Sequence, residues 1–220
     1  MSTSADAASF IRANTAIAAA PLVPEIRLHL AGEITPLWHA TEATLARDQL
    51  PPPYWAFAWA GGQTLARYIL DHPEIVAGKR VLDFGAGSGL LALAAAKAGA
   101  AAVTAAEIDP FAAAAIALNG ALNGVEVSIE TTDVIGRRPA LWQVVLVGDM
   151  CYERPLAERL TAWLRMLAAE GVVVLLGDPG RNYLPKDGLV PLARYTVPTP
   201  LDLEDRATRE GVVWRLTALP

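Results

Sequence analysis

From Lys79 onward, short apolar runs alternate with longer stretches whose apolar residues recur at helical spacing. The short runs predict strands buried in a sheet, and the longer stretches predict helices that pack against it. The expected strands span residues 80–84, 102–108, 125–131, 144–148 and 172–176, and the expected helices span residues 90–98, 111–123 and 155–169. Strands that alternate with helices in this way are typical of an open, mostly parallel sheet covered on both faces.

The end of the chain departs from this alternation. Residues 189–197 and 212–219 are two strand-like runs, and the charged loop between them has no helical pattern. Two strands that follow each other without a crossover helix pair in antiparallel fashion. We therefore expect an α/β fold with seven strands, mostly parallel, in which the last strand is antiparallel.

The N-terminal part, residues 1–60, has a different pattern and is expected to form a helical extension ahead of a domain at residues 61–220. Residues 4–20 are rich in alanine and place apolar side chains at helical spacing, which predicts one helix. Pro21 follows directly and would end that helix.

A second helix of the extension is expected to begin at Thr35-Pro36, because a capping residue followed by proline is typical of a helix start. It would stop before Pro51, since proline is not tolerated inside a helix. An aromatic segment at residues 54–62 then leads into a short helix at residues 63–71.

Composition and charge exclude several classes of protein. The net charge is −5 and there is no run rich in Lys and Arg, so we expect no protein that grips nucleic acid through its phosphates. No stretch of about 18 residues is free of charged and polar residues and of glycine, which argues against a membrane-spanning helix. No basic region precedes an apolar run near the N-terminus, so a secretory signal is not expected. With Cys151 as the only cysteine, the sequence favours a cytoplasmic protein.

The strongest functional signal is a glycine-rich turn after the first of the alternating strands, Gly85-Ala86-Gly87-Ser88-Gly89. Alternate glycines let the backbone turn tightly and approach a ligand where a Cβ would clash. A dinucleotide fingerprint needs its third glycine one place later, where Leu90 stands, and the Gly-Lys-Ser/Thr of a phosphate loop is absent. A purely structural turn is the remaining alternative.

The acidic residue before the turn helps to choose among these ligands, because Asp83 would repel a diphosphate and attract an ammonium group. The acidic-x-Gly-x-Gly-x-Gly pattern resembles motif one of the seven-strand S-adenosylmethionine-dependent methyltransferases. The resemblance implies a Rossmann-like fold, S-adenosylmethionine as cofactor and S-adenosylhomocysteine as product. It also implies that Gly85, Gly87 and Gly89 lie along the methionine and ribose of the cofactor, with Asp83 near the amino group.

Further carboxylates follow the next two strands. Glu107 comes 24 residues after Asp83 and ends the second strand, from where it can accept hydrogen bonds from both ribose hydroxyls. Asp109 either shares that role or caps the helix that starts at Pro110. Asp133, just past the third strand, either accepts a hydrogen bond from the adenine amino group or is a solvated turn residue.

The chain after the fourth strand, where the reacting centre of this architecture lies, reads Gly148-Asp149-Met150-Cys151-Tyr152-Glu153. It lacks both prolines of the Asn/Asp-Pro-Pro-Tyr motif found in adenine and glutamine N-methyltransferases, and Cys151 lacks the preceding proline of a pyrimidine C5 nucleophile. Asp149-x-x-Tyr152 resembles the motif of the seven-strand protein-lysine methyltransferases. The segments similar to bacterial relatives of the electron-transfer-flavoprotein beta-subunit lysine methyltransferase are residues 10–15, 24–30, 53–63, 148–153 and 177–181.

This resemblance covers nearly the whole chain and implies roles for individual residues. Asp149 would position the substrate nitrogen, the alternative being a cap for the helix near Pro155, and Tyr152 would shape the lysine channel. Trp59 and the Gly61 backbone would line the cofactor pocket. Either Trp55 or Trp142 would add a wall, the alternative being that these rings are core packing.

The substrate that the resemblance implies is the electron transfer flavoprotein beta subunit, with a ribosomal protein as a second target. A small-molecule, nicotinamide-type N-methyltransferase is the alternative, and a non-enzymatic cofactor-binding protein is a third class. No metal is expected, because the three histidines are scattered and lack companion ligands.

Overall fold

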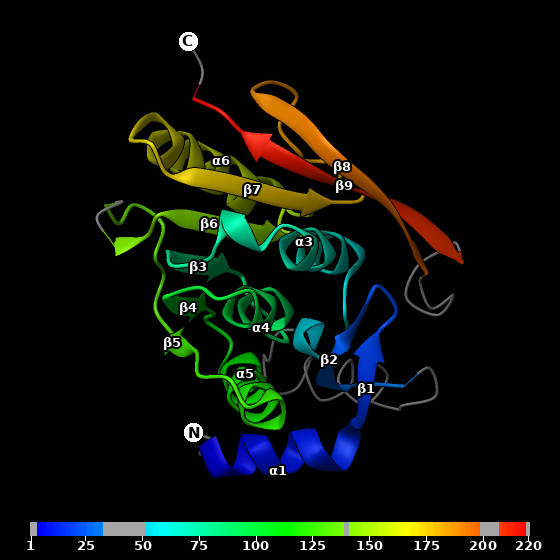
Figure 1. Cartoon of the computed structure of the whole chain (residues 1–220). Helices are drawn as coiled ribbons and strands as arrows, with labels where there is room; N and C mark the ends of the chain where they lie inside the picture. The colour runs from blue at the N-terminus through cyan, green and yellow to red at the C-terminus, as the bar shows by residue number, and fades with distance from the viewer. Residues whose placement is uncertain (1–3, 33–51, 139–140, 199–206, 219–220) are drawn as a thin grey trace.

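Seven strands form one sheet in the computed structural model, which describes residues 4–32, 52–138, 141–198 and 207–218 (Figure 1). The strand order is β5-β4-β3-β6-β7-β9-β8, and β9 runs antiparallel to the other six strands. The strands are β3 (Arg80–Phe84), β4 (Ala102–Ala106), β5 (Ser128–Glu130), β6 (Val144–Gly148), β7 (Val173–Asp178), β8 (Leu189–Pro198) and β9 (Thr208–Leu216). The expected mostly parallel sheet with an antiparallel last strand is confirmed.

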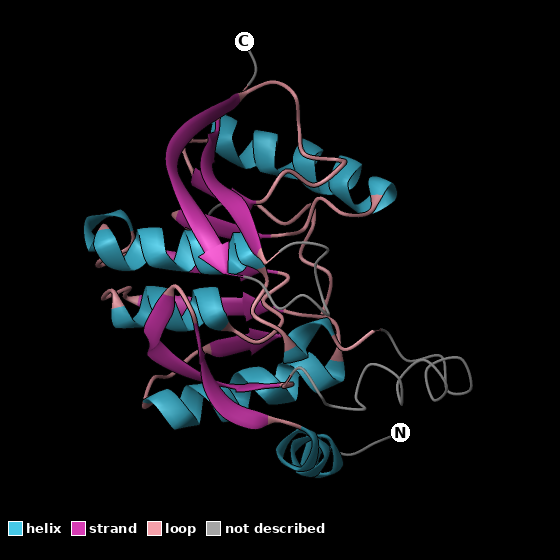
Figure 2. Ribbon diagram, turned by 90° about the vertical axis from the view of Figure 1, so that its right-hand side faces the viewer, coloured by secondary structure: helices cyan, strands magenta, loops and turns pink. Residues whose placement is uncertain are grey.

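Helices cover both faces of this sheet (Figure 2). Helices α3 (Ala60–Asp71), α4 (Leu90–Lys97) and α5 (Pro110–Asn123) lie on one face, and α6 (Arg154–Ala169) lies on the other. Because side chains alternate along a strand, Leu146 belongs to the core under α3 and α4, whereas its neighbour Val145 packs in the core under α6. The two cores together explain why the strands are almost continuously apolar.

The helices and strands of the sheet agree with the sequence prediction to within a few residues. β4 ends at Ala106 rather than at Ile108, and β5 is shorter than expected, at Ser128–Glu130. Helix α5 starts at a capping Asp109 and ends at Gly124, whose φ of 65° is left-handed and suits glycine. Capping and stop signals were therefore sufficient to place this helix.

The N-terminal segment differs from its prediction. Helix α1 (Ser4–Asn14) is followed by β1 (Ala16–Ala20), which pairs antiparallel with β2 (Val23–Leu30). The expected single helix over residues 4–20 is therefore wrong at its C-terminal end. The Asn14 side chain donates to the Phe10 carbonyl, 2.9 Å away, at the helix end, and pairing with β2 outweighs the helical propensity of the alanines. The second helix expected for the extension falls on residues 33–51, outside the described residues.

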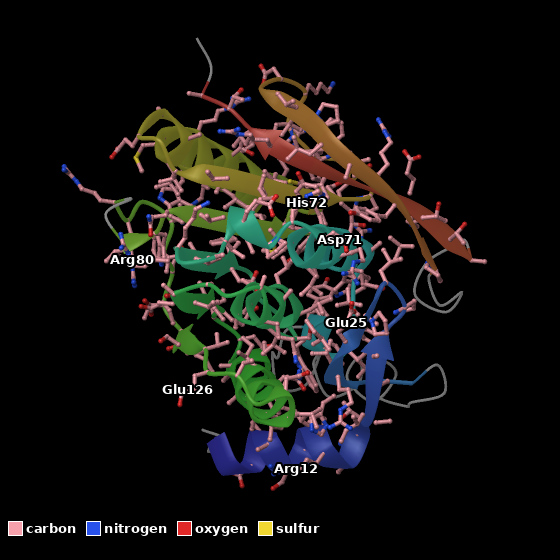
Figure 3. The ribbon with its side chains drawn as sticks, viewed as in Figure 1. Arg12, Glu25, Asp71, His72, Arg80 and Glu126 are labelled. Carbon is pink, nitrogen blue, oxygen red and sulfur yellow. The ribbon has the colours of Figure 1, made fainter. Side chains whose placement is uncertain are left out.

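The β1–β2 hairpin is tied to the domain by polar contacts. Arg67 on α3 bridges Glu25 on β2 and Asp71 on its own helix, with both N···O distances at 2.7 Å. Figure 3 labels Glu25 on the hairpin and Asp71 on α3. On the other side, the Asn119 side chain of α5 accepts from the His29 backbone N–H at 2.8 Å. The hairpin therefore packs against the helices of one face rather than extending the sheet.

The carboxyl ends of the parallel strands meet at one edge, where ligands bind in folds of this kind. No α-helix connects β7 to β8, nor β5 to β6 within the residues described there. Among the described residues, no helix is both long enough and apolar enough to cross a lipid bilayer.

Candidate functional site

The glycine turn between β3 and α4 has the geometry that only glycine adopts readily. Gly85, Gly87 and Gly89 have φ angles of 65°, 52° and 81°. A Cβ on Gly85 would collide with the Met150 side chain, and one on Gly89 would lie 3.2 Å from Ile116. A Cβ on Gly87 would meet nothing closer than the Trp55 Cα at 3.8 Å. The positive φ angles favour glycine at all three positions, and the space over Gly87 is open to a ligand.

Asp83 lies beneath this turn and is fully buried. Its Oδ2 accepts from the Ala92 backbone N–H in the first turns of α4, at 2.9 Å. Its Oδ1 has no hydrogen-bond partner among the residues that the structure describes. Burial raises the pKa of Asp83 to about 7, and the nearby Glu107 carboxylate adds to the rise. Asp83 therefore anchors α4 and keeps one oxygen unpaired; its contact with a cofactor amino group stays a prediction.

Glu107 and Asp109 have different partners after β4. Glu107 Oε2 accepts from the Gly87 backbone N–H at 2.9 Å, and its Oε1 accepts from the Asp109 N–H at 3.1 Å. Asp109 Oδ1 accepts from the Phe111 N–H at 2.8 Å and so caps α5. Between them, Ile108 is 72% exposed and presents an apolar side chain beside the turn. Asp109 is a helix cap, and Glu107 is the carboxylate that faces the glycine turn.

Asp133 is a turn residue on the surface. Its Oδ1 accepts from the Ile135 N–H at 2.9 Å, and its Oδ2 pairs with Arg159 at 2.8 Å. The Ile135 hydrogen bond, followed by Arg159, lowers the pKa of Asp133. Its proposed contact with adenine is untested, and these bonds account for both of its oxygens.

Asp149, directly after β6, is the most heavily hydrogen-bonded carboxylate of the site. It is 7% exposed and has a φ of 56°, which is unusual for a residue other than glycine. Its Oδ2 accepts from the N–H groups of Gly61 and Gly62, the latter at 3.1 Å, and so caps the first turn of α3. Its Oδ1 accepts from Arg181 Nε at 2.9 Å and Nη2 at 2.8 Å.

The charge of Asp149 reflects opposing effects. Burial raises its pKa to about 6, the Arg181 guanidinium lowers it, and the neighbouring Asp178 raises it. Asp149 does cap a helix, but the helix is α3, which precedes it in sequence, and not the one near Pro155, where Glu153 is the N-cap residue. The sequence analysis gave helix capping as the alternative role of Asp149. Capping is confirmed, but the capped helix is α3 and not the helix near Pro155.

Aromatic rings line the approach to Asp149. Trp59 is the N-cap residue of α3, and its Nε1 donates to the Tyr54 carbonyl at 2.9 Å. The Tyr54 ring lies 5.6 Å from the Tyr152 ring, and both tyrosines are 40% exposed. The Arg181 guanidinium lies 5.8 Å from the centroid of the Trp59 ring. Trp59 and Tyr152 therefore belong to one cluster next to Asp149.

Trp55 and Trp142 were the two candidates for a wall of the cofactor pocket, with core packing as the alternative. The structure gives them different positions. Trp142 is buried and packs edge-on against Trp163 of α6, with ring centroids 6.3 Å apart, so it is core packing. Trp55 is also buried, but its backbone is the nearest atom group over Gly87. Trp55 therefore forms a wall of the open space at the glycine turn.

The sequence reasoning missed Arg181 and Asp178 as functional residues. Asp178 is buried at the end of β7, and its Oδ1 accepts from the Gly180 and Arg181 backbone N–H groups, each at 2.7 Å. The block of residues 177–181 was noticed by resemblance, but nothing local assigns Arg181 to Asp149, 32 residues away. Contacts over such separations leave no periodic signal in a sequence.

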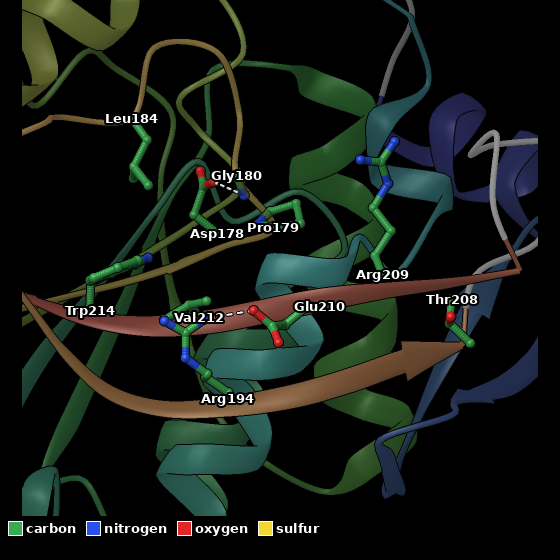
Figure 4. A pocket seen from close by; sticks show the side chains of 10 residues that line it. All are labelled: Asp178, Pro179, Gly180, Leu184, Arg194, Thr208, Arg209, Glu210, Val212 and Trp214. Atoms are coloured by element: carbon green, nitrogen blue, oxygen red, sulfur yellow. Dashed lines mark hydrogen bonds and ion pairs between the residues drawn. The ribbon is translucent and has the colours of Figure 1, made fainter.

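The loop that carries Arg181 also forms one wall of a cavity of about 350 Å³ (Figure 4). Asp178, Leu184 and Trp214 line it, together with the Arg194–Glu210 ion pair on β8 and β9, whose N···O distance is 2.5 Å. In the described part of the chain, no group of three or more His, Cys, Asp or Glu side chains is arranged to hold a metal ion.

Comparison with known sequences finds two related groups of protein methyltransferases. The family model described as ribosomal protein L11 methyltransferase (PrmA) matches residues 65–175. The electron transfer flavoprotein beta subunit lysine methyltransferase of Xenopus laevis is 39% identical over 94% of this chain and 85% of its own length. The enzyme of the same name from Rattus norvegicus is 38% identical over 94% of this chain and 82% of its own length. The ribosomal protein L11 methyltransferase of Pseudomonas aeruginosa is 33% identical over 81% of this chain and 58% of its own length.

Solved structures share the fold at low sequence identity. A ribosomal protein L11 methylase from Lactobacillus delbrueckii subsp. bulgaricus superposes with a TM-score of 0.51 and 22% identity, covering 73% of this chain and 81% of the other. Magnesium protoporphyrin IX methyltransferase from Synechocystis PCC 6803, with bound S-adenosylmethionine, gives a TM-score of 0.53 and 15% identity, covering 71% of this chain and 78% of the other. These likenesses establish the Rossmann-like methyltransferase architecture.

Proposed function

This chain belongs to the electron transfer flavoprotein beta subunit lysine methyltransferase family, and from that membership we propose that it transfers methyl groups from S-adenosylmethionine to lysine side chains of the electron transfer flavoprotein beta subunit. The observation that carries the proposal is the position of Asp149. This buried carboxylate follows β6, next to the strand that leads into the glycine turn. Its partner Arg181 lies over the Trp59 ring, which contacts Tyr54 and through it Tyr152.

The residues present fit S-adenosylmethionine. The open space over Gly87 can hold part of the cofactor because glycine has no Cβ to fill it. The Glu107 carboxylate lies beside this space, where it accepts a hydrogen bond from the Gly87 N–H. Gly85, Gly87 and Gly89 would lie along the methionine and ribose, with Asp83 near the amino group. Glu107 would accept from the ribose hydroxyls, and Asp133 would accept from the adenine amino group. When bound, the cofactor supplies a methyl group on a sulfonium that is already activated for transfer.

Gly61 and Trp59 remain proposed cofactor neighbours. In the structure the Gly61 N–H is engaged by Asp149, and its Cα faces the Gly177 carbonyl. The support for a cofactor role of these two residues is therefore indirect. Gly61 fixes the Asp149 carboxylate through its N–H, and Trp59 lies two residues before Gly61, at the start of α3. Asp109 would support the cofactor site without contacting the cofactor, because it caps α5 and its N–H donates to Glu107.

The protein residues prepare the lysine nitrogen. A free lysine has a pKa of about 10.4, so its ammonium must release a proton to solvent before the nitrogen lone pair can attack. Aromatic walls at Trp59, Tyr54 and Tyr152 disfavour the charged ammonium and lower that pKa. Asp149 attracts and orients the approaching group, and holding the two reactants in line accounts for much of the rate gain. No residue of the chain needs to form a covalent intermediate.

A ribosomal protein is a second proposed substrate, supported by the likeness to ribosomal protein L11 methyltransferases. A nicotinamide-type small molecule remains the alternative. We further propose that nucleic acid is not a substrate, since the net charge is −5. A cytoplasmic location is part of the same proposal, because the only cysteine, Cys151, is buried and unpaired.

The test is methyl transfer from labelled S-adenosylmethionine to purified electron transfer flavoprotein, followed by mass spectrometry of the beta subunit. Asp149→Asn keeps the shape but removes the charge, so turnover should fall by one to several orders of magnitude, as expected when reactants are misplaced. Affinity for S-adenosylhomocysteine, measured by calorimetry, should change far less. Asp187→Asn, which removes an exposed carboxylate on the loop before β8, is the matched control and should retain full turnover.

Two outcomes would contradict the proposal. Absence of label on the beta subunit, with label on nicotinamide instead, would favour the small-molecule alternative. Full turnover by Asp149→Asn would remove Asp149 from the mechanism and leave it as the cap of α3.

A further inference from the structure

The contacts of Asp149 leave no lone pair for a substrate. An ionised carboxylate offers about four acceptor positions on its two oxygens. In this structure Oδ2 accepts from Gly61 and Gly62, and Oδ1 accepts from two nitrogens of Arg181. A lysine nitrogen that is oriented by Asp149, as the proposed function requires, must therefore take the place of one of these donors.

The two pairs of donors differ in how easily they can leave. The Gly61 and Gly62 N–H groups belong to the first turn of α3, and a Cβ at Gly61 would already overlap the Gly177 carbonyl, so this backbone has no room to move. Arg181 reaches Asp149 only through its side chain. Its guanidinium is at the end of a flexible stem, and its side chain is 21% exposed. The exchangeable oxygen is therefore Oδ1.

The surroundings of the guanidinium are those that suit a lysine cation. Arg181 is held by a buried carboxylate on one side and lies 5.8 Å from the Trp59 ring centroid on another. A carboxylate combined with an aromatic face is a recurring way to bind an ammonium group. Tyr152, on the same segment as Asp149, continues the aromatic wall through its contact with Tyr54.

We propose that Arg181 occupies, in the substrate-free protein, the position at Asp149 Oδ1 that the ammonium end of a substrate lysine takes, and that the two cations exchange when substrate binds. Arg181 is then a positioning residue that keeps the buried carboxylate paired until the lysine arrives. The backbone of Arg181 stays in place, because Asp178 Oδ1 holds its N–H and that of Gly180, so only the side chain has to swing. This proposal rests on the lysine-methyltransferase function above.

The exchange predicts that removing the guanidinium improves cation binding. The probe is n-butylammonium, which reproduces the end of a lysine side chain, titrated by NMR into protein loaded with S-adenosylhomocysteine. If Arg181 leaves Asp149 about one-tenth of the time, Arg181→Met should bind the probe about tenfold more tightly than wild type, since apparent affinity scales with the competent fraction. Arg181→Lys should bind it close to the wild-type level, because a cation still competes.

The titration is done at pH 9, because Asp149 has to stay ionised when Arg181 is absent. The charged groups that face Asp149 are Arg181 and Asp178. Cys151, on its own segment, stays a neutral thiol at pH 9, because burial raises its pKa to about 12. Loss of the Arg181 guanidinium raises the pKa of Asp149. At neutral pH, Arg181→Met could therefore bind the probe less tightly because Asp149 is protonated, and this would hide the gain from removing the competing cation. Arg165→Met, which removes an arginine of α6 that pairs with Asp187, is the control and should leave binding unchanged.

Equal or weaker binding of n-butylammonium by Arg181→Met at pH 9 would overturn the exchange and keep Arg181 on Asp149 throughout the reaction. Arg181→Gln is the second variant in case methionine disturbs the fold, and a gain of several-fold is expected from it. The measurement needs no methyl transfer. A failure of the lysine-methyltransferase proposal would appear as wild type without activity, whereas a failure of the exchange appears as unchanged probe affinity.

Discussion

Two buried carboxylates on neighbouring strands, Asp83 on β3 and Asp149 after β6, are handled in opposite ways. Burial raises both pKa values, to about 7 and about 6 respectively. Asp83 has one backbone partner and an oxygen without a hydrogen bond to any described residue. Asp149 has two backbone partners on one oxygen and an arginine on the other. Similar burial thus produces one carboxylate that keeps an oxygen unpaired among the described residues and one that is paired with a cation.

The comparison separates two halves of the site. The cofactor half consists of the glycine turn with Asp83 and Glu107, and the nitrogen half consists of Asp149, Arg181 and the start of α3. The cofactor half is built from segments close in sequence, whereas the nitrogen half joins segments up to 88 residues apart. The first is set by local backbone geometry and the second by tertiary contacts.

The largest effect is expected at Asp83 and concerns stability against pH. Because its folded pKa of about 7 lies above the ordinary 3.8, the folded state holds the proton more tightly, so this group makes the protein less stable as pH rises toward 7. Asp83→Asn removes that loss. From pH 5 to pH 8, the free energy of unfolding of Asp83→Asn should gain about 3 kcal/mol relative to wild type, at 1.36 kcal/mol per pKa unit.

Chemical denaturation at several pH values measures this gain. Curves of wild type and Asp83→Asn that run parallel between pH 5 and pH 8 would show that Asp83 keeps one charge state in this range. The contrast with Asp149 would then disappear.

The next effect tests the cofactor half. Glu107→Ala should weaken the binding of S-adenosylhomocysteine by about 1.5–3 kcal/mol, because hydrogen bonds to a charged acceptor are lost. Asp109→Ala should mainly lower the unfolding free energy, by about 1 kcal/mol, because it removes the cap of α5. Calorimetric affinity for S-adenosylhomocysteine and thermal unfolding, measured on both variants, distinguish the binding role from the capping role. A larger affinity loss in Asp109→Ala would reverse the two roles.

The smallest effect tests the nitrogen half through two adjacent glycines. A Cβ at Gly61 would overlap the Gly177 carbonyl and lie 2.6 Å from Asp149 Oδ2, so Gly61→Ala should cost roughly 1–3 kcal/mol of stability. It should also reduce turnover, because the cap is displaced. Gly62→Ala is the matched control, since its Cβ would meet no atom within 4 Å. Equal unfolding midpoints for the two variants in urea would mean that this contact is not tight.

Local signals were enough to predict the sheet, most helices and the glycine turn. The Asp109 cap and the Gly124 stop are examples, since both act within a few residues of the helix they bound. The hairpin at residues 16–30 was missed because alanines carry a helical propensity that strand pairing with β2 overrides.

The nitrogen half of the site could be predicted only in part. Asp149 and Tyr152 are three residues apart in sequence and were identified by motif, but the arginine that pairs with Asp149 comes from the loop after β7. The helix that Asp149 caps was also out of reach, because the capped N–H groups precede it by 88 and 87 residues. Pairings of this kind depend on strand order, which the sequence pattern alone does not specify.

The fastening of the first turn of α3 has a consequence for motion. The opening N–H groups of a helix have no partner within the helix and are usually where it frays. Here two of them are bound by the Asp149 carboxylate, which in turn is held by Arg181. Local unwinding of α3 and release of that carboxylate are therefore one event. The exchange of the Gly61 and Gly62 amide hydrogens with solvent would thus report how often the nitrogen half comes apart.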